Sequence, residues 1–316
     1  MKNPKKELLS VIVPCFNEEE VIEETYKRLT NVLKENHINY EILFINDGSI
    51  DKTLEILTNI AKNDPKIKII SFSRNFGHQS AVSAGIHHCK GDYAVIIDAD
   101  LQDPPEVIPE LLSLAKKEQA NVVYGARKKR KGETFFKRFT AWAFYKIINL
   151  LSDVPLPENT GDFRLIDKKV IDAFNQLPEK NKYIRGLISW IGFKQIPYYY
   201  VREPRFAGET KYPLSKMIKF ATTALLYFTR KPLKLATTMG FMSIVVGLLL
   251  TIYVFLSLFL KPQQTVSGWA STIIIIIFFG GVQLLTIGVM GEYIGSIFDE
   301  IKNRPMYIID KTYNIK

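Results

Sequence analysis

Two long apolar runs near the C-terminus constrain the fold more than any other feature of the sequence. Residues 235–260 contain 26 residues without a charged side chain, and residues 269–291 contain 23 more. A helix needs about 20 residues to cross a hydrocarbon core about 30 Å thick. A buried helical hairpin in a soluble protein is the alternative, but such a helix seldom stays apolar all round for this length. The sequence therefore predicts a C-terminal hairpin of two transmembrane helices, at about 235–260 and 269–293, within residues 235–295.

The basic residues predict the orientation of this hairpin. Arginine and lysine side chains stand before the first run and after the second, whereas the short connection carries only Lys261. Positively charged segments flanking membrane spans stay on the cytoplasmic side. We therefore expect a multi-pass protein of the cytoplasmic membrane, with the N-terminal part and a tail at 296–316 both in the cytoplasm.

The overall charge indicates an anionic partner. The formal net charge is +10. No nucleic-acid-binding module is visible in the sequence, so nucleic acid is not expected as a partner. Anionic headgroups and phosphorylated lipids beside the predicted spans are the better candidates.

Residues 1–211 are expected to form an α/β domain in the cytoplasm. Short apolar stretches alternate there with longer amphipathic ones. The expected strands are 8–13, 40–45, 67–72, 93–97 and 121–124, and the expected helices are 19–35, 52–62, 79–89 and one opened by Pro104-Pro105 with Asp103 as its cap. This alternation predicts a doubly wound, mostly parallel sheet.

Two stretches combine basic and aromatic residues in an amphipathic pattern. They are about residues 135–151, inside the expected α/β domain, and residues 212–234, just before the first span. Amphipathic helices of this composition lie in the interface of a membrane. We expect both to be interfacial helices, with ordinary packing helices as the alternative.

Polar segments follow four of the expected strands, at 14–18, 46–49, 73–75 and 98–100. In open parallel sheets, ligands bind outside the carboxyl ends of the strands. The sequence therefore predicts a ligand site at this edge. No G-x-G-x-x-G motif follows the first strand, which argues against a dinucleotide dehydrogenase. His78 lies near this edge, and we assign it a packing or loop-ordering role.

Asp98, Asp100 and Gln102 form a candidate metal site. They follow a hydrophobic strand at positions i, i+2 and i+4. Carboxylate and amide oxygens are hard ligands that suit Mg²⁺ or Mn²⁺, and a metal there would neutralise a leaving diphosphate. Capping of the next helix is the alternative for acidic residues in this position.

Six motifs resemble those of family-2 glycosyltransferases, and in particular the polyprenyl-phosphate hexosyltransferases such as dolichol-phosphate mannose synthase and bactoprenol glucosyltransferase. In chain order they are SVIVPCFNEEE (10–20), INDGSIDKT (45–53), SFSRNFGHQSA (71–81), GDYAVIIDADLQDPPE (91–106), GDFRLID (161–167) and REPRFAGETKYPL (202–214). The resemblance covers nearly the whole chain. It implies a GT-A fold for the catalytic domain.

The resemblance also implies residues for the donor and the metal. The implied donor contacts are Pro14, Phe16, Glu18, Asp47, Asp98 and Asp100, to which we add Arg127 as a candidate for donor phosphate. The implied ligands of Mg²⁺ or Mn²⁺ are Asp98, Asp100 and Gln102. Phe16 stands where many relatives have tyrosine, which keeps a ring face and removes a hydroxyl.

The resemblance implies an inverting transfer of a hexose from a nucleotide-sugar to a polyprenyl phosphate. UDP-glucose, UDP-GlcNAc and GDP-mannose all fit as donors, and bacterial character and the two-span anchor favour undecaprenyl phosphate with UDP-glucose or UDP-GlcNAc. A lipid phosphate is already ionised near neutral pH, so catalysis depends on positioning and on stabilising the leaving diphosphate. Asp162 is the family's candidate base, and orienting the acceptor or an arginine is a second role for it. Pairing with Arg164 in a turn after Gly161 is the structural alternative.

Arginine suits the acceptor phosphate because its planar fork forms two parallel hydrogen bonds. The candidates for this contact are Arg164, Arg202, Arg205, Lys211 and Lys137. Arg205 and Lys211 rank highest because their glycine-containing loop connects the α/β domain with the second amphipathic stretch. The candidate catalytic residues are therefore Asp162, Asp100 and Arg205.

Three other classes of protein stay open. A processive polysaccharide synthase usually has more spans and a QxxRW-type motif. A membrane-anchored glycosyltransferase with a soluble or protein acceptor would give a product that does not extract into organic solvent. A non-catalytic nucleotide-sugar-binding membrane protein would show no metal-dependent turnover. The oligomeric state, including a homo-oligomer, is also open.

Overall fold

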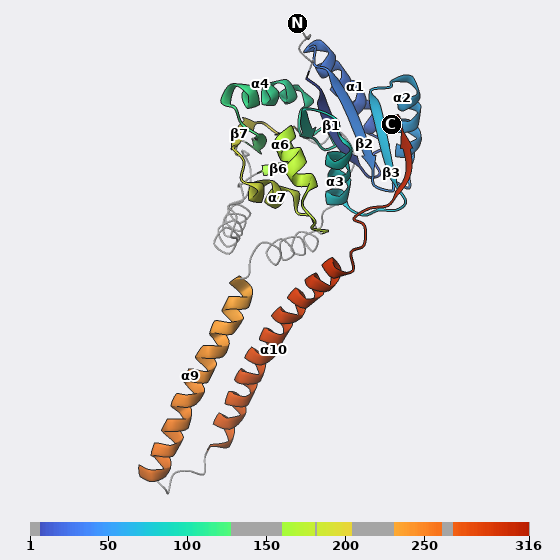
Figure 1. The fold of residues 1–316 in the computed structure, drawn as a ribbon. Helices are drawn as coiled ribbons and strands as arrows, with labels where there is room; N and C mark the ends of the chain where they lie inside the picture. The colour runs from blue at the N-terminus through green and yellow to red at the C-terminus, as the bar shows by residue number, and fades with distance from the viewer. Residues whose placement is uncertain (1–6, 128–159, 181, 204–230, 261–267, 316) are drawn as a thin grey trace. The chain divides into compact units, whose positions relative to one another are not determined.

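The computed structural model describes residues 7–127, 160–180, 182–203, 231–260 and 268–315 (Figure 1). The chain divides into two compact units. The first consists of residues 1–146, 154–213 and 304–316, and the second of residues 147–153 and 214–303. The first unit carries the sheet, and the second carries two long helices.

The first unit is built on an eight-stranded sheet with the order β7-β5-β6-β4-β1-β2-β3-β8. The strands are β1 (Leu9–Cys15), β2 (Tyr40–Asn46), β3 (Ile67–Phe72), β4 (Tyr93–Ile96), β5 (Val122–Arg127), β6 (Thr160–Asp167), β7 (Gln195–Tyr200) and β8 (Ile309–Tyr313). The pairs β1–β2, β1–β4, β2–β3 and β5–β7 are parallel. β6 is antiparallel to β4 and β5, and β8 is antiparallel to β3.

The sheet is mixed, whereas the sequence predicted a mostly parallel one. The prediction is correct for β1 to β4, whose apolar runs alternate with helices. It is wrong around β6, which is antiparallel to both of its neighbours. The turn after Gly161 that we considered as an alternative is also not formed, because Gly161 lies within this strand. β6 is a strand buried from Thr160 to Ile166, although it contains Gly161 and Asp162, which are residue types depleted in strands. Burial between two neighbouring strands outweighs that propensity.

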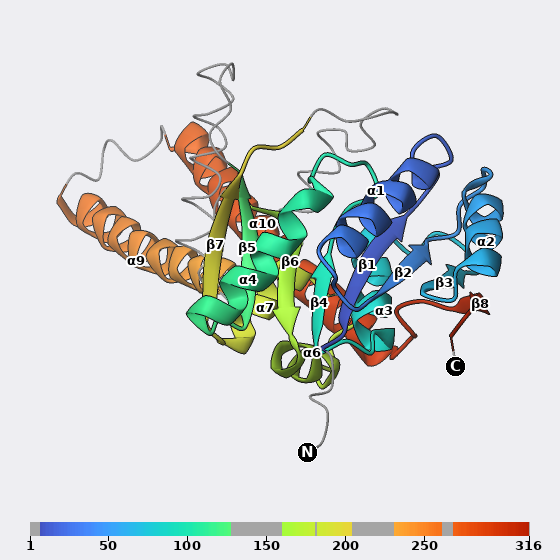
Figure 2. The ribbon, with the colours of Figure 1, turned by 90° about the horizontal axis from the view of Figure 1, so that it is seen from above.

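Helices cover both faces of the sheet. They are α1 (Ile22–Glu35), α2 (Thr53–Asn63), α3 (His78–His88), α4 (Ile108–Glu118), α6 (Lys168–Asn175) and α7 (Ile184–Ile191), with a 3-10 turn η1 (Pro105–Val107) before α4. Figure 2 shows α1 and α4 in front of the sheet and α3 behind it. Alternate residues of β1 pack on opposite faces. Val11 and Val13 join the cluster that contains residues of α1, and Ile12 meets α3.

α3 lies unusually close to β1. A Cβ atom added to Gly85 of α3 would lie 2.2 Å from Cγ2 of Ile12, a separation that side chains cannot adopt. The glycine therefore allows the helix to pack directly on the strand. This contact holds α3, whose first residue is His78, against the middle of the sheet.

The C-terminal residues return to the sheet, whereas we expected a separate tail at 296–316. β8 pairs with the edge strand β3. Tyr307 stacks on Phe72 with ring centroids 4.9 Å apart and an interplanar angle of 11°. The amide of Asn314 donates to the carbonyls of Ala61 at 2.7 Å and Ile67 at 2.9 Å. The C-terminal segment is thus part of the first unit.

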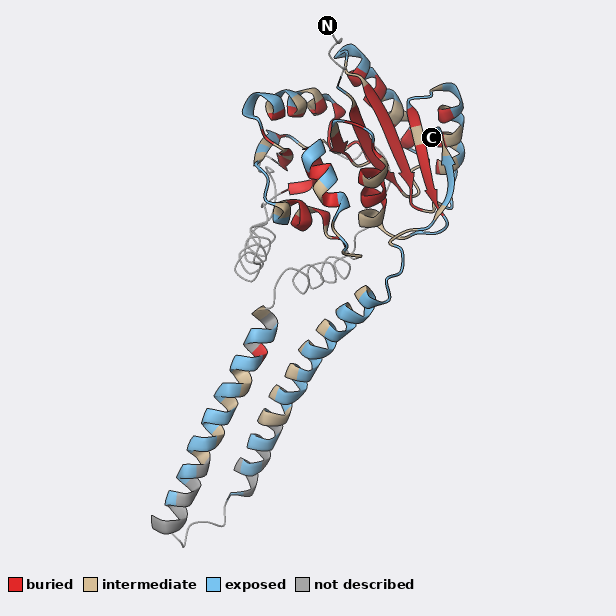
Figure 3. Cartoon of the chain, viewed as in Figure 1, coloured by how far each residue is buried: buried red, intermediate tan, exposed pale blue. Residues whose placement is uncertain are grey.

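The described helices of the second unit are α9 (Lys231–Leu260) and α10 (Trp269–Ile301), which contact each other. Among the described residues, one helical stretch is long and apolar enough to cross a membrane, Phe278–Ile301, and a shorter apolar helical stretch is Ala236–Leu250. Apolar side chains in both helices face outward: Phe241 is 67% exposed and Leu284 is 72% exposed. Figure 3 contrasts these exposed helices with the buried strands. An apolar surface of this extent requires an apolar partner.

The predicted interfacial helices fall mostly outside the described residues. The stretch 135–151 lies wholly outside them, and of 212–234 only residues 231–234 are described, as the start of α9. α10 continues to Ile301, eight residues beyond the predicted end of the second span at 293.

Acidification is expected to weaken the contact between the C-terminal segment and α3. His87 Nδ1 lies 3.1 Å from the Tyr307 hydroxyl, and its ring packs near Phe174. Burial, with the charges of Lys182 and His88, lowers the pKa of His87 to about 4. An unfolded histidine has a pKa of about 6.5, so the unfolded state binds more protons between these values, and the free energy of unfolding falls as pH is lowered through that range.

This prediction is checked by measuring the thermal unfolding midpoint of the full-length protein in detergent between about pH 7.5 and about pH 4.5. His87→Gln should flatten the dependence on pH. Tyr307→Phe removes the hydroxyl but leaves the imidazole buried, so it should retain the dependence. Equal pH dependence in the wild type and in His87→Gln would refute the assignment.

Candidate active site at the carboxyl ends of the strands

The loops after β2 and β3 are joined by one carboxylate. Asp47 accepts hydrogen bonds from the backbone amides of Phe76 at 2.7 Å and Gly77 at 2.9 Å, and from the Asn75 side chain at 3.0 Å. Gly77 has a φ of 100°, a conformation that favours glycine, and it immediately precedes α3. Asp47 therefore fixes the turn that delivers His78 to the site. Burial raises the pKa of Asp47, and the two backbone hydrogen bonds oppose that rise.

The loops after β1 and β2 are also tied together. The backbone amide of Asn17 donates to the Ser49 hydroxyl at 3.0 Å, and the Asn17 side chain accepts from the amide of Ile50 at 2.9 Å. The predicted donor residues of this region are Pro14 in β1 and Phe16 and Glu18 in the loop after it. The structure thus gathers Pro14, Phe16, Glu18 and Asp47 at one edge of the sheet, as the sequence predicted.

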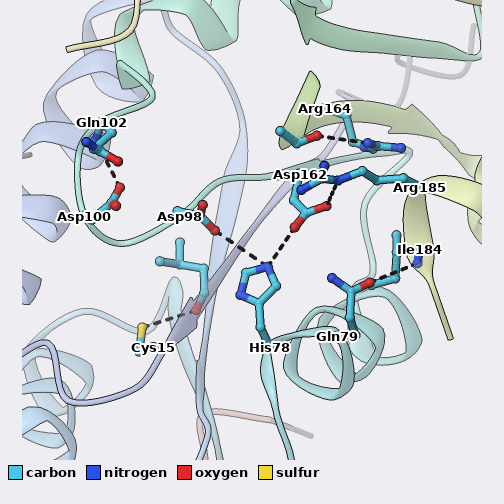
Figure 4. Close-up of polar contacts among 12 residues, drawn as sticks. Cys15, His78, Gln79, Asp98, Asp100, Gln102, Asp162, Arg164, Ile184 and Arg185 are labelled. Carbon is cyan, nitrogen blue, oxygen red and sulfur yellow. Dashed lines mark hydrogen bonds and ion pairs between the residues drawn. The ribbon is translucent and has the colours of Figure 1, made fainter. Parts of the chain in front are cut away.

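His78 lies between two carboxylates from different strands (Figure 4). Its Nε2 is 3.1 Å from Oδ2 of Asp162, in β6, and 3.8 Å from Oδ1 of Asp98, which follows β4. The sequence suggested only a packing or loop-ordering role for His78. The structure instead makes it the link between the candidate base and the candidate metal site.

Arg185 of α7 holds the other side of Asp162. Its Nε donates to Oδ1 of Asp162 at 2.7 Å, and its Nη1 donates to the carbonyl of Thr160 at 2.9 Å. The start of α7 is fixed separately, because the backbone amide of Ile184 donates to Oε1 of Gln79 at 2.9 Å. Asp162 is therefore paired with Arg185 and His78, and the pairing with Arg164 considered from the sequence is wrong.

The charges of this cluster support one another. Burial alone would raise the pKa of Asp162, but Arg185 and His78 hold it well below its usual range. Burial alone would lower the pKa of His78, but the hydrogen bond to Asp162 and the charges of Asp98 and Asp162 raise it to about 9. Burial raises the pKa of Asp98 to about 6, against the effect of His78. The cluster pairs the buried carboxylate of Asp162 and the partly buried one of Asp98 with cations, which is the arrangement that makes burial of charge tolerable.

Asp98, Asp100 and Gln102 lie on one loop after β4. Oδ1 of Asp100 accepts from the backbone amide of Gln102 at 3.1 Å, and Leu101 between them has a φ of 56°. Figure 4 shows Asp98 directed to His78 and Asp100 toward Gln102. Within the described residues, no group of three or more His, Cys, Asp or Glu side chains is arranged to hold a metal. The donor set of two carboxylates and one amide nevertheless fits Mg²⁺ or Mn²⁺ in kind, since such sites leave positions for substrate phosphate.

Asp103 does not cap the following helix as predicted. Pro104 is the N-cap of η1, with no side-chain cap. Asp103 is fully buried, accepts a hydrogen bond from the Tyr200 hydroxyl, and lies 3.5 Å from Nε of Arg202. The backbone amide of Glu203 donates to the carbonyl of Gln102 at 2.9 Å. The predicted acceptor residue Arg202 therefore lies directly beside the predicted metal loop.

The remaining predicted site residues have different outcomes. Arg164 is 3% exposed, its Nη2 donates to the carbonyl of Gly161 at 3.1 Å, and burial lowers its pKa to about 10. This position supports the backbone of β6, so the predicted contact of Arg164 with an acceptor phosphate is not supported. Arg127 is the last residue of β5. Lys137, Arg205 and Lys211 lie outside the described residues.

Two residues of the cluster had no chemistry predicted from the sequence. His78 stands in the motif SFSRNFGHQSA. The only sign in the sequence that it belongs to the site is its position after a glycine at the start of a predicted helix. Arg185 lies in no recognised motif, and only the packing of α7 against β6 and α3 brings it to Asp162.

Comparison with known proteins gives the following relations. A family model described as "Glycosyl transferase family 2" matches residues 10–174. The "Uncharacterized glycosyltransferase YkcC" of Bacillus subtilis (strain 168) is 52% identical, over 97% of this chain and 94% of that protein. The "SfII prophage-derived bactoprenol glucosyl transferase" of Shigella flexneri is 40% identical, over 96% of this chain and 98% of that protein. A solved mannosyltransferase, PcManGT from Pyrobaculum calidifontis in complex with GDP-Man and Mn²⁺, has a TM-score of 0.46 at 16% identity and covers 90% of this chain and 86% of its own.

Replacement of Asp47 is expected to destabilise the turn before α3. Asp47→Asn would present an NH₂ group to one of two buried backbone amides and leave it without an acceptor, which costs about 1–3 kcal/mol. Asp51→Asn is the matched control, because Asp51 also accepts from backbone amides, those of Thr53 and Glu19, at a more exposed position. Chemical denaturation of both variants measures the difference. Equal losses of stability would contradict the role of Asp47 in this turn.

Proposed function

The chain belongs to glycosyl transferase family 2, and from this premise we propose that it transfers a hexose from a nucleotide-sugar to a polyprenyl phosphate, with inversion and with Mg²⁺ or Mn²⁺, at the cytoplasmic face of a membrane. The observation that carries the proposal is the cluster of Asp98, His78, Asp162 and Arg185 beside the candidate metal loop. A protein that only bound the donor would not need a buried carboxylate, that of Asp162, held by two cationic side chains next to Asp98.

The proposed acceptor rests on the relatives and on the second unit. The bactoprenol glucosyl transferase of Shigella flexneri matches this chain over 98% of its own length, so the similarity includes the C-terminal helices. The chain's own helices expose large apolar side chains. A lipid acceptor would explain both the similarity in the C-terminal helices and their exposed apolar side chains. We therefore favour undecaprenyl phosphate over a soluble or protein acceptor.

The proposed membrane arrangement is a hairpin in which α9 and α10 both cross the bilayer. The stretch Phe278–Ile301 has the length and composition of a span, and α9 extends over 30 residues, from Lys231 to Leu260. Basic residues on the outer sides of the two runs favour a cytoplasmic α/β unit. Residues 135–151 and 212–230 are proposed to lie in the interface.

The donor would bind at the carboxyl edge of the sheet. We propose that the nucleoside contacts Pro14, Phe16 and Glu18, with Asp47 holding the turn beneath it. Arg127 is proposed for the donor phosphates. Asp98, Asp100 and Gln102 would hold the metal, which supplies neutralisation of the charge on the leaving diphosphate.

The acceptor phosphate would approach from the side of β7. Arg202 lies there, 3.5 Å from Asp103, and we propose that it acts with Arg205, Lys211 and Lys137. An oxygen of the lipid phosphate forms the new bond to the anomeric carbon, while the bond from that carbon to the donor diphosphate breaks and its electron pair leaves with the diphosphate. Positioning of the two phosphates supplies the main rate enhancement.

UDP-glucose is the favoured donor. The relatives named bactoprenol glucosyl transferase are 39–40% identical to this chain over most of its length. UDP-GlcNAc is the alternative. Sugar transfer from labelled UDP-glucose, UDP-GlcNAc and GDP-mannose to undecaprenyl phosphate, followed by extraction into organic solvent, identifies the donor.

The test uses the full-length protein with Mn²⁺, Mg²⁺ or EDTA. Asp100→Asn should lower transfer by about 100-fold or more, since it removes a metal ligand and its charge. Asp92→Asn is the control, because Asp92 lies at the opposite end of β4 and accepts from the backbone of Leu8. It should keep wild-type activity.

Three outcomes would contradict the proposal. Donor turnover without labelled lipid would indicate a different acceptor. Donor binding without turnover would favour a non-catalytic nucleotide-sugar-binding protein. Full activity in EDTA would remove the metal from the mechanism.

A further inference from the structure

Both oxygens of Asp162 are engaged by nitrogen atoms. Oδ1 lies 2.7 Å from Nε of Arg185, and Oδ2 lies 3.1 Å from Nε2 of His78. The residue is 8% exposed. A general base needs an oxygen directed at the proton that it removes. Each oxygen of Asp162 is directed at a side chain of the protein instead.

We propose that Asp162 acts in the transfer as a fixed anion that positions His78 and Arg185, and that it does not remove a proton from the acceptor. His78 and Arg185 are then positioning residues of the site. This inference rests on the proposed function and specifies how the acceptor side of the site works.

The chemistry of the acceptor agrees with this assignment. A phosphate monoester has a second pKa of about 6, so near neutral pH most of it carries no proton. The bond to the anomeric carbon then forms from an oxygen that is already ionised. The electron pair of the broken bond leaves with the nucleoside diphosphate, and the balance requires no proton transfer.

The contacts of His78 and Arg185 join four elements of the fold. Asp98 follows β4, His78 begins α3, Asp162 belongs to β6 and Arg185 belongs to α7. Gln79, next to His78, also holds the start of α7 through the amide of Ile184. Replacing one of these four side chains would shift the carboxylate of Asp98 and helix α7 relative to each other. Misplacement of about 1 Å can cost about 100-fold in rate.

The test compares Asp162→Asn, Arg185→Gln and the double variant in transfer to the lipid phosphate. Asn keeps the shape of Asp162 and an oxygen for Arg185, so it separates hydrogen bonding from charge. Lys168→Gln is the matched control, because Lys168 pairs with Asp172 at 3.0 Å on the surface. It should leave activity unchanged. If Arg185→Gln fails to fold, Arg185→Lys replaces it, since Lys keeps the charge but loses the fork.

Positioning predicts non-additive effects. Asp162→Asn and Arg185→Gln should each lower kcat/KM for the lipid by roughly 100-fold, and the double variant should fall within about threefold of the worse single variant. The thermal unfolding midpoints of the same four proteins form a second cycle, which should also show coupling between the two positions. Additive losses in both cycles would overturn the proposal.

Dependence on pH separates positioning from base catalysis. If Asp162 removes a proton, the gap between wild type and Asp162→Asn should close by about tenfold or more from about pH 5.5 to about pH 8.5, as the lipid phosphate ionises on its own. Positioning predicts a ratio that stays constant or widens as pH rises, because Asp162→Asn removes a contact that raises the pKa of His78, and the variant then loses the charge of His78 at lower pH than the wild type. A closing gap would establish Asp162 as a base and overturn the inference.

These experiments distinguish failure of the proposed function from failure of the positioning role of Asp162. Absence of labelled lipid with the wild-type protein contradicts the proposed acceptor, whereas the thermal cycle still reports whether Asp162 and Arg185 are coupled. An active wild type with a closing gap contradicts only the positioning role of Asp162.

Discussion

The site depends on one imidazole held between two carboxylates. Asp98 and Asp162 come from segments that are distant in the chain, and each lies within 4 Å of Nε2 of His78. Two carboxylates this close, with Asp162 buried and Asp98 partly buried, would repel each other in the absence of cations, and one of them would take up a proton. His78 and Arg185 reduce that repulsion. The turn held by Asp47 and the packing of α3 on β1 fix the start of α3, and so they hold His78 between Asp98 and Asp162.

Family membership and the mixed sheet together give a GT-A-like α/β fold. Its carboxyl edge carries a polar, charged site, whereas the second unit exposes apolar side chains along two helices. The proposed reaction between a water-soluble nucleotide-sugar and a lipid phosphate would use both kinds of surface in one protein. After α10 the chain returns to its sheet through β8 and the stacked pair Tyr307 and Phe72.

The pattern of apolar and amphipathic segments along the sequence predicted the part of the site that lies at the ends of β1 to β4. β1 to β4 are apolar runs between amphipathic helices, so the position of Asp47 and Asp98 at one edge followed from the sequence. The other half depends on long-range packing. β6 contains residues that disfavour a strand, and β8 lies beyond the apolar helices, so neither was predicted. Arg185 reaches Asp162 only through the packing of α7, whereas Arg164, in the same strand as Asp162, is buried against the backbone of that strand.

The most direct test is a structure of the full-length protein with UDP-glucose and Mn²⁺, in which the anomalous scattering of manganese locates the ion. We predict an anomalous peak in contact with Asp100, beside the donor diphosphate at the carboxyl edge of the sheet, with His78 still between Asp98 and Asp162. Donor bound at this edge with no manganese peak at Asp100, or donor bound elsewhere on the protein, would contradict the proposed site.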